Sequence, residues 1–582
     1  MIDRRVLCAA FLCALTPFLA EFARAEGGGE IEKSGHWKAE KPVGGDLPPV
    51  DSAALAATPR NGAEWLHFGG DLRGLRHSPI AELTPSAVRK LEIAWAFQTG
   101  VPGQLEANPI IYDGVMYTTS ARNRLFALDA ATGAVLWRYD HPQPDGLLLC
   151  CGPANRGVAI AGDAVIMGTL DARLIAFHRR TGEILWNTEV APFQDGYSVT
   201  SAPFIVNDVA IMGIGGAEYG VRGFFDGYDV KTGKRLWRHY TVPAAGEPGA
   251  ETWAGNSNEK GGGSSWATGA YDPELDTLYV AVGNPAPDWN GDVRKGDNLF
   301  TDSLLAIDPK TGERKWYFQF TPHDVWDYDG NSELWLVDLS VDGKPVKAVV
   351  QANRNGYLYV IDRTDGSFLR ATQYVEQLNW ATIDEKGRPV VDPKMVPVDP
   401  GVTPERICPG LGGGNNAAYA GSVNPSTNIA YVTVIESCST LVKSSPIFVK
   451  GVPFFGGVFA FPDAEAGTAY GHVSAIDLNT GETVWKYRDE YPMMAGSLST
   501  AGGVVFTGNT SGHALALDAK DGSVLWRFPM GSGVRSHPVA YQIDGTTYVA
   551  IGSGGGGLVQ TLAGEDPMVP YGSTLFVFRV GK

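Results

Sequence analysis

A short phrase that recurs along the chain constrains its fold more than any other feature. Alternating apolar residues lead to an acid, a Thr-Gly or Asp-Gly pair follows, and tryptophan stands eight residues after the acid, as in LFALDAATGAVLW. Six copies end at Trp137, Trp186, Trp237, Trp316, Trp485 and Trp526, the second with His178 as its acid, and a seventh carries Arg370 in place of tryptophan. Period-two alternation on both sides of a turn predicts paired β-strands, and seven copies predict the blades of a β-propeller.

Each part of the phrase has an expected role in such a blade. The glycine accepts the positive φ of the turn, and the acid binds backbone amides within it. The tryptophan is expected to pack between neighbouring sheets. Pairing of LEIAWAFQ (91–98) with STLFVFRV (573–580) would complete an eighth blade and remove the free sheet edges. The chain is therefore predicted to be all-β, an eight-bladed β-propeller with tryptophan-docking repeats.

The N-terminus has the pattern of a cleavable secretory signal. Arg4 and Arg5 precede an apolar stretch at 6–20, and Ala23-Arg24-Ala25 resembles a cleavage site. A membrane anchor is the alternative, but the apolar stretch is shorter than the roughly 20 residues that a span needs. We therefore expect no membrane span and a periplasmic location. The expected organisation is a signal peptide at 1–25, an N-terminal arm at 26–60 and the propeller at 61–582.

Charge and cysteine content narrow the partners and the disulfides. With 64 acidic and 47 basic residues, the net charge of −17 argues against nucleic acid or an anionic membrane as partner. Four cysteines follow the signal, an even number that fits two disulfides, Cys150–Cys151 and Cys408–Cys438. Adjacent cysteines bond only through a strained ring, so two free buried thiols are the alternative for the first pair.

Polar side chains follow three predicted strands, where the central channel of a propeller opens. They are Glu218 in GGAE, Asn284 in GNP, and the acids of HDVWDYDG at 323–330. Taken singly, each motif is explained as a surface turn. Carboxylates and a carboxamide together suit a hard cation such as Ca²⁺, which takes 6–8 oxygen ligands.

These motifs together resemble the quinoprotein alcohol dehydrogenases, the methanol/ethanol dehydrogenase family that uses pyrroloquinoline quinone. The resemblance runs from WLHFGGD near residue 65 to the end of the chain. Its motifs are CC followed by NRG, GAEYGVRG (216–223), GGGSSWATGAYDP (261–273), GNPAPDWN (283–290), WDYDG (326–330) and NRNGYLYVIDRTDG (353–366). The family fold is an eight-bladed propeller with the quinone on its axis, in agreement with the repeats.

The resemblance implies a role for each matching position. The Cys150–Cys151 ring would cover one face of the quinone, and Trp266 would stack on the other. The positions that match those binding its carboxylates and ring edge are Glu106, Arg156, Thr200, Gly216, Ala217 and Asn416. Arg354 would lie beside the reactive carbonyl. The metal ligands would be Glu218, Asn284 and Asp327, with Asp327 also the general base.

The implied reaction is oxidation of a primary alcohol to an aldehyde. A metal ion on the quinone oxygen acts as a Lewis acid, Asp327 takes the hydroxyl proton, and hydride passes to the quinone. No CxxCH occurs in the sequence, so no c-type haem is attached to this chain and a separate cytochrome c is the expected acceptor. The resemblance is also compatible with a homodimer.

Asp329 refines the expected metal. It stands two residues after Asp327, where lanthanide-dependent members of the family also have aspartate, and a trivalent ion benefits from another negative oxygen ligand. We therefore expect a lanthanide ion, with Ca²⁺ as the alternative. Asp288 departs from the family pattern, because it is inserted before the tryptophan that often lines the substrate pocket. The rival functions are a calcium-dependent dehydrogenase of another alcohol, aldehyde or sugar, and a non-catalytic propeller scaffold.

Overall fold

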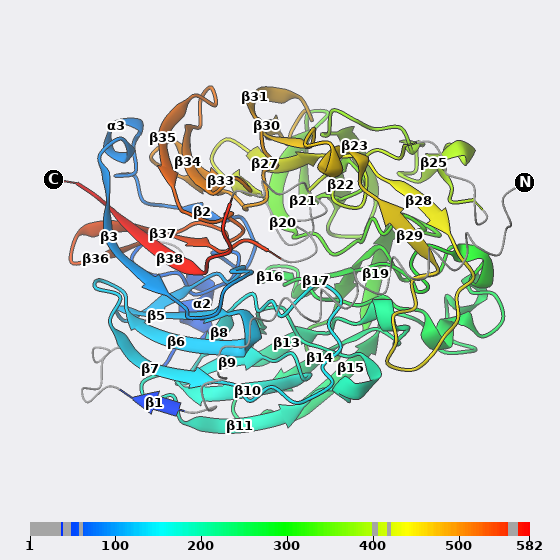
Figure 1. Cartoon of the computed structure of the whole chain (residues 1–582), viewed down its shortest axis with the longest axis horizontal. Helices are drawn as coiled ribbons and strands as arrows, with labels where there is room; N and C mark the ends of the chain where they lie inside the picture. Colours follow the sequence, from blue (N-terminus) through cyan, green and yellow to red (C-terminus); the bar gives the residue numbers. More distant parts are fainter. Residues whose placement is uncertain are drawn as a thin grey trace, which may run out of the picture. The chain divides into compact units, whose positions relative to one another are not determined.

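The computed structural model describes residues 36–38, 48–57, 62–398, 406–415, 421–556 and 569–581. Residues 36–582 form one compact unit in which eight sheets of four or five strands are the blades (Figure 1), so the predicted eight-bladed propeller is confirmed. The predicted signal peptide and Asn416 lie outside the described residues. Within the described part of the chain, no helix is long and apolar enough to cross a membrane.

The first four blades follow one another along the chain. Blade 1 contains β1 (His36–Lys38), β4 (Ile110–Tyr112), β5 (Val115–Ser120), β6 (Arg124–Asp129) and β7 (Val135–Asp140). Blade 2 contains β8 (Val158–Ala161), β9 (Ala164–Gly168), β10 (Arg173–His178) and β11 (Ile184–Glu189). Blade 3 contains β12 (Phe204–Val206), β13 (Val209–Gly213), β14 (Phe224–Asp229) and β15 (Arg235–Tyr240). Blade 4 contains β16 (Ala270–Asp272), β17 (Thr277–Val282), β18 (Ser303–Ile307) and β19 (Arg314–Gln319).

The remaining blades include two that contain strands from before β4, namely β2 in blade 7 and β3 in blade 8. Blade 5 contains β20 (Trp335–Val341), β21 (Lys344–Ala352), β22 (Tyr357–Asp362) and β23 (Phe368–Gln373). Blade 6 contains β26 (Ser422–Asn424), β27 (Ile429–Glu436), β30 (Tyr470–Asp477) and β31 (Thr483–Asp489). Blade 7 contains β2 (His77–Ser78), β32 (Leu498–Thr500), β33 (Val504–Gly508), β34 (His513–Asp518) and β35 (Val524–Pro529). Blade 8 contains β3 (Leu91–Gln98), β36 (Val539–Ile543), β37 (Thr546–Ser553) and β38 (Thr574–Val580).

Few elements lie outside the blades. Two hairpins pair β24 (Ala381–Ile383) with β25 (Pro389–Val391), and β28 (Thr440–Lys443) with β29 (Gly457–Ala460). The described α-helices are α2 (Ser52–Ala57), α3 (Pro85–Val88) and α4 (Pro462–Glu465). Short 3₁₀ turns are η1 (Ala121–Asn123), η2 (Phe193–Asp195), η3 (Ala217–Tyr219), η4 (Ala250–Thr252), η5 (Ser257–Lys260), η6 (Gly291–Val293) and η7 (Pro393–Met395).

The ring closes where the sequence predicted it. β3 pairs antiparallel with β38, from Leu91 opposite Val580 to Gln98 opposite Thr574. The eighth blade therefore combines a strand from the start of the propeller with three from its end (Figure 1), which leaves no open edge at the junction. In the expected N-terminal arm, β1 pairs with β7, and Val50 and Leu55 are buried against the first two blades.

Four of the repeat tryptophans, together with Trp95, each connect one blade to the next. Trp186 donates its indole N–H to the carbonyl of Val230 (3.0 Å), the residue after the turn acid Asp229. The same bond joins Trp95 to Ala130, Trp137 to Arg179, Trp237 to Pro309 and Trp485 to Ala519. The turn glycine lies beneath the ring, since a Cβ built on Gly233 would be 2.5 Å from Trp186. Glycine is thus needed both for its φ of +68° and for the approach of the neighbouring indole.

The repeat without tryptophan keeps the same contact by other means. Arg370 donates from Nη2 to the carbonyl of Leu478 (2.6 Å) and from Nη1 to that of Asn479 (2.9 Å). Leu478 follows the turn acid Asp477, as Val230 follows Asp229, and a Cβ on Gly481 would lie 2.8 Å from Nε of Arg370. A planar guanidinium therefore replaces the indole as both donor and packing group.

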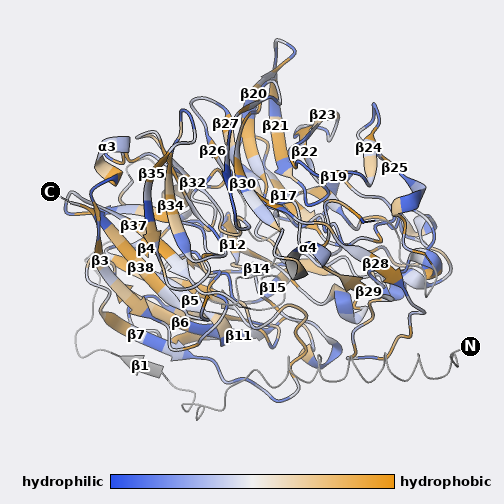
Figure 2. Ribbon diagram, turned by 45° about the horizontal axis from the view of Figure 1, so that its top comes forward, coloured by the Kyte–Doolittle hydropathy of each residue, from blue (hydrophilic) through white to orange (hydrophobic). Residues whose placement is uncertain are grey.

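The core lies between the sheets. The second strands β5, β9, β13 and β17 are buried along their whole length, whereas the outer strands β11 and β19 have only half-buried and exposed positions. Figure 2 shows hydrophobic residues concentrated on the strands of the blades. This packing leaves the loops at the strand ends as the place for polar chemistry.

Candidate active site

The predicted site residues come from equivalent places in successive blades. Some precede the first strand of a blade, as Arg156 precedes β8 and Thr200 precedes β12. Others follow the second strand, as Glu218 follows β13 and Asn284 follows β17. Because the first two strands are antiparallel, the start of one and the end of the other lie at the same edge of the sheet. The repeat therefore brings residues far apart in sequence to one side of the channel.

Two arginines meet one buried carboxylate on the first side of the site. Arg156 Nη2 lies 3.0 Å from Glu106 Oε2, and Arg535 Nη2 lies 2.8 Å from Glu106 Oε1. Arg156 also donates from Nη1 to Thr200 Oγ1 (2.8 Å), and its guanidinium lies 4.7 Å from the centre of the Trp266 ring. Arginine forks held in this way present a fixed positive surface that suits the carboxylates of an acidic planar cofactor.

Gly216 and Ala217 bring backbone close to the same region. Gly216 has a φ of +119°, and a Cβ there would lie 2.3 Å from the carbonyl oxygen of Gly196. Only glycine fits this approach. Ala217 is buried at the start of η3, and Glu218 is the next residue of that turn. The segment thus positions Glu218 towards the centre of the site.

The loop at 324–330 is shaped by its first acid. Asp324 accepts the backbone N–H groups of residue 326 through Oδ1 (2.9 Å) and residue 328 through Oδ2 (2.8 Å). Within this cradle, Asp327 has a φ of 60° and Asp329 a φ of 49°. Left-handed backbone is unusual for residues other than glycine and is concentrated at functional sites. Here it places two carboxylates of one short loop in the same buried region.

The carboxylates of this region are poorly compensated. Burial raises the pKa of Asp327 well above its usual range, although Arg354 opposes the rise with Nη1 3.6 Å from Asp327 Oδ1. Burial likewise raises the pKa of Asp329 and of Glu218, and each of the three carboxylates raises the pKa of a neighbour. Such a group gains stability from a bound cation.

The donor set fits a hard metal ion. A Cβ on Gly283 would lie 2.4 Å from Asp329 Oδ1, so glycine makes room for this carboxylate. The next residue, Asn284, is buried and its Nδ2 has no hydrogen-bond partner. Within the described ranges, no three His, Cys, Asp or Glu side chains converge tightly enough to form a metal cluster by themselves. The fit therefore depends on the asparagine and on cofactor oxygens as well as on the carboxylates.

Arg354 is held in place by a backbone carbonyl on the side away from Asp327. It is buried, and its Nε and Nη2 donate to the carbonyl of Leu411. Leu411 belongs to the GLGGGNN segment, whose Asn416 lies outside the described residues. The guanidinium is thus fixed with its remaining nitrogen towards Asp327.

One of the two expected disulfides is present. Cys408 and Cys438 are bonded. Cys150 and Cys151 are not bonded in the structure, but their sulfur atoms lie 2.7 Å apart, closer than two thiols in van der Waals contact, so the vicinal disulfide stays a prediction. A disulfide needs about 2.05 Å between sulfurs, which adjacent residues reach only in a strained ring. The thiol of Cys150 nonetheless lies near Glu218, which contributes to the raised pKa of Cys150 after the Cys151 contact and burial.

Sequence reasoning missed Arg535 and the burial of Asp288. Arg535, which binds Glu106, stands alone as a basic residue in the Gly- and Ser-rich segment GSGVRSHP, a signal that could have indicated it. Asp288 is fully buried, and neither of its carboxyl oxygens has a hydrogen-bond partner. The sequence showed Asp288 as an insertion but gave no sign of its burial.

The site thus combines two arginines that can bind an anion, a group of carboxylates that can bind a cation, and the fixed Arg354. Residues 65–377 match the family described as glucose/ethanol/alcohol dehydrogenase, beta-propeller domain. Residues 469–566 match a second family, described as outer membrane protein assembly factor BamB.

Similar proteins cover nearly the whole chain. Quinoprotein alcohol dehydrogenase PedH of Pseudomonas putida is 38% identical over 543 residues, which cover 89% of this chain and 90% of that protein. The lanthanide-dependent methanol dehydrogenase of Methylacidiphilum fumariolicum is 34% identical and covers 89% of this chain and 90% of its own length. The solved structure of a europium-containing methanol dehydrogenase has a TM-score of 0.85 at 32% identity, covering 90% of this chain and all of its own.

The chain therefore belongs to the quinoprotein alcohol dehydrogenases, the enzymes that oxidise alcohols with pyrroloquinoline quinone. The resemblance predicted from the sequence motifs is confirmed at the level of the family.

Proposed function

We propose that the protein oxidises a primary alcohol to the aldehyde in the periplasm, with pyrroloquinoline quinone and a lanthanide ion, and passes the electrons to a separate cytochrome c. The observation that carries the proposal is the group of Glu218, Asp327 and Asp329 beside Arg354, in which Asp329 is buried and the other two are partly buried. Three carboxylates attract a trivalent cation more strongly than a divalent cation of similar size, because the Coulomb energy grows with the charge of the ion.

Each residue has a role that follows from its position. When bound, the quinone and metal supply the electron acceptor for alcohol oxidation. Glu218, Asn284, Asp327 and Asp329 would hold the metal. Arg156 and Thr200, with Glu106 behind them, would bind the cofactor carboxylates, while Trp266 and the Cys150–Cys151 pair would enclose its rings.

Asp327 has the second task of taking the hydroxyl proton of the alcohol at a carboxylate oxygen. Arg354 keeps a positive charge 3.6 Å from that carboxylate and favours its ionised form. Arg354 is held by the carbonyl of Leu411, so it can stabilise negative charge without first reorganising.

The acceptor and the compartment are proposed from the sequence. The chain has no CxxCH, and its net charge of −17 would steer a basic cytochrome c towards it. The signal pattern at 1–25 supports the periplasmic location.

The decisive experiment is dye-linked alcohol oxidation by metal-free protein reconstituted with the quinone and either La³⁺ or Ca²⁺. Turnover with La³⁺ and little with Ca²⁺ is the expected result. Turnover with Ca²⁺ alone would reject the lanthanide and keep the enzyme class. No turnover and no bound quinone with either metal would reject the dehydrogenase and favour a scaffold.

The role of Asp329 has its own matched variants. Asp329→Ala should lower the affinity for La³⁺ by at least about tenfold, since it removes a charged ligand of a trivalent ion. Calorimetric titration of the quinone-loaded protein measures this affinity. Asp342→Ala is the control, because Asp342 is an exposed turn aspartate with a similar φ of 51°. Equal affinities in the two variants would exclude Asp329 as a ligand.

A further inference from the structure

Asp288 is a buried carboxylate that the reaction as described does not use. It lies in the GNPAPDWN segment, which follows β17 and leads into η6. Its exposed fraction is 1%, and both carboxyl oxygens lack a hydrogen-bond partner. A buried carboxylate in this condition is costly, and native proteins rarely retain one without a partner or a ligand.

The nearby arginine does not supply the missing partner. Arg294 is buried, and it donates from Nε to the carbonyl of Pro287 (3.0 Å) and from Nη2 to the backbone carbonyl of Asp288 (3.1 Å). Its other bonds go to Asn298 Oδ1 and to the carbonyl of Asp324. Arg294 therefore holds the backbone of the loop in place and leaves the carboxyl group of Asp288 unpaired.

The Asp288 side chain lies near the proposed metal ligands and the proposed base. After burial, the charges of Glu218 and Asp327 are the largest causes that raise the pKa of Asp288, and Asp288 in turn raises the pKa of Cys150. It thus lies within electrostatic reach of a proposed metal ligand, the proposed base and the paired cysteines.

The residue that follows Asp288 lies in an aromatic cluster. Trp289 stacks on Phe455 with ring centres 4.6 Å apart and meets Phe459 edge-on at 4.5 Å. Both phenylalanines belong to the β28–β29 hairpin, and the neighbouring Phe454 donates its N–H to the carbonyl of Glu218 (2.6 Å). A buried carboxyl group without a hydrogen-bond partner can discriminate sharply between substrates that bring a hydrogen-bond donor and those that do not.

We propose that Asp288 selects primary alcohols that carry a second hydrogen-bond donor, a hydroxyl or an ammonium group, and binds that donor while the first hydroxyl reacts. The inference rests on the proposed alcohol oxidation and names its substrate class. A donor on the substrate would satisfy the carboxyl oxygens, whereas an alkyl end in the same place would leave them buried and unpaired.

Isosteric substrates test this selectivity directly. 1,3-Propanediol and 3-amino-1-propanol have the same number of heavy atoms as 1-butanol and differ from it only at the far end. The quantity measured is kcat/KM of the quinone- and metal-loaded enzyme for each, divided by the value for 1-butanol. We expect at least one ratio to exceed 1 and to fall about tenfold or more in Asp288→Ala. The two ratios distinguish a hydroxyl from an ammonium donor.

Two further variants control the measurement. Asp288→Asn keeps the shape and one acceptor oxygen, so it should retain part of a preference for the diol and lose a preference for the amine. Asp292→Ala removes a carboxylate from the same segment whose side chain is 61% exposed, and it should leave both ratios unchanged. Calorimetric binding of the three alcohols to quinone-loaded protein gives a readout that does not depend on turnover.

The outcomes separate this inference from the proposed function. Ratios that are the same in the parent and in Asp288→Ala, in turnover and in binding, would overturn the inference while leaving alcohol oxidation intact. A loss of metal affinity in Asp288→Ala with unchanged ratios would also overturn it and make Asp288 a metal ligand. If no alcohol were oxidised, the proposed function would fail, and equal binding of the three alcohols would then reject the selectivity as well.

Discussion

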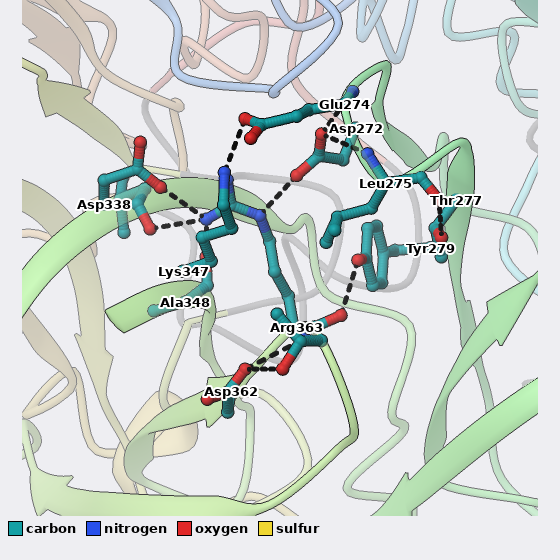
Figure 3. Close-up of polar contacts among 12 residues, drawn as sticks. Asp272, Glu274, Leu275, Thr277, Tyr279, Asp338, Lys347, Ala348, Asp362 and Arg363 are labelled. Carbon is teal, nitrogen blue, oxygen red and sulfur yellow. Dashed lines mark hydrogen bonds and ion pairs between the residues drawn. The ribbon is translucent and has the colours of Figure 1, made fainter. Parts of the chain in front are cut away.

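At the interface of the fourth and fifth blades, Arg363 and Asp272 bury opposite charges together, whereas at the candidate active site Asp288 is buried without a partner. Arg363 Nε lies 2.7 Å from Asp272 Oδ2, and the two side chains are 6% and 5% exposed. Figure 3 shows the arrangement, in which Arg363 also reaches Asp338. Asp272 further accepts two backbone N–H groups, from residues 274 and 275.

The contrast appears in the acidity of the two aspartates. Burial acts to raise the pKa of Asp272, but the hydrogen bond and charge of Arg363 outweigh it, so the pKa is lowered. For Asp288, burial and neighbouring negative charges act in the same direction and outweigh the charge of Arg294, so the pKa is raised well above its usual range. A satisfied buried charge belongs to the architecture, whereas an unsatisfied one indicates a place for a ligand.

The largest effect is expected where the unsatisfied group has a chemical task. Asp327→Asn removes the proposed base with almost no change of shape. We expect turnover to fall by about 10²–10⁴-fold, the usual contribution of a general base. The thermal midpoint of the cofactor-free protein should stay the same or rise, because a buried negative charge is lost. Dye-linked turnover and calorimetry measure the two quantities, and turnover within about tenfold of the parent would exclude Asp327 as the base.

A variant of the buried pair Arg363–Asp272 should lose stability and keep its turnover. Arg363→Met leaves Asp272 buried without its partner, so we expect a loss of about 3–5 kcal/mol of unfolding free energy. Turnover per folded molecule should not change. Urea unfolding gives the free energy, and Asp338→Asn serves as the control because Asp338 is 73% exposed and should change stability by less than about 0.5 kcal/mol. Similar losses of unfolding free energy in both variants would mean that the buried pair Arg363–Asp272 contributes no more than the exposed pair Arg363–Asp338.

The blades could be predicted from sequence because their signals are local. The turn acid, the glycine and the tryptophan lie within one repeat. The tryptophan of one blade packs on the turn of the next blade, and this contact recurs from blade to blade. The closing pair β3 and β38 was predictable since an unpaired strand remained at each end of the repeats. Even Arg370 could be recognised as a repeat position, although its equivalence to tryptophan became visible only from its bonds to Leu478 and Asn479.

The site was predictable only in part. The family resemblance indicated Glu106, Arg156 and Asp327, and the last two lie in the motifs NRG and WDYDG. The pairing of Arg535 with Glu106 joins residues more than 400 positions apart in the sequence, and no local pattern reports such a contact. The burial of Asp288 depends on the β28–β29 hairpin and on Arg294, so the inserted residue was visible but its environment was not.

The repeat itself offers a third test, of steric fit between blades. Gly233→Ala forces a Cβ to within 2.5 Å of Trp186 at a φ of +68°, and we expect a loss of about 2–3 kcal/mol of unfolding free energy. Gly343→Ala is the matched control, because its φ is +75° and a Cβ there has nothing within 4 Å. That variant should lose only about 1 kcal/mol from backbone strain. Equal losses would show that the indole moves aside.

The smallest effect concerns a partnered carboxylate at the edge of the propeller. Glu376 is partly buried, which would raise its pKa, but hydrogen bonds from Tyr470 (2.7 Å) and Lys486 (3.0 Å) lower the pKa to about 2. A carboxyl group whose pKa is lower in the folded than in the unfolded chain stabilises the fold above its unfolded pKa of about 4.3. That contribution is lost as the pH falls from about 4 towards 2.

Glu376→Gln should therefore lower the unfolding free energy by about 1 kcal/mol at pH 6, after allowance for solvent screening of a partly exposed group. The difference from the parent should shrink as the pH falls through this range, because the parent carboxylate is then protonated and resembles the amide. Urea unfolding at a series of pH values follows the difference. A constant difference down to pH 2 would show that the Glu376 side chain stabilises the fold through its shape and neutral hydrogen bonds. The stabilising effect of a partnered carboxylate would then not depend on its charge at this position.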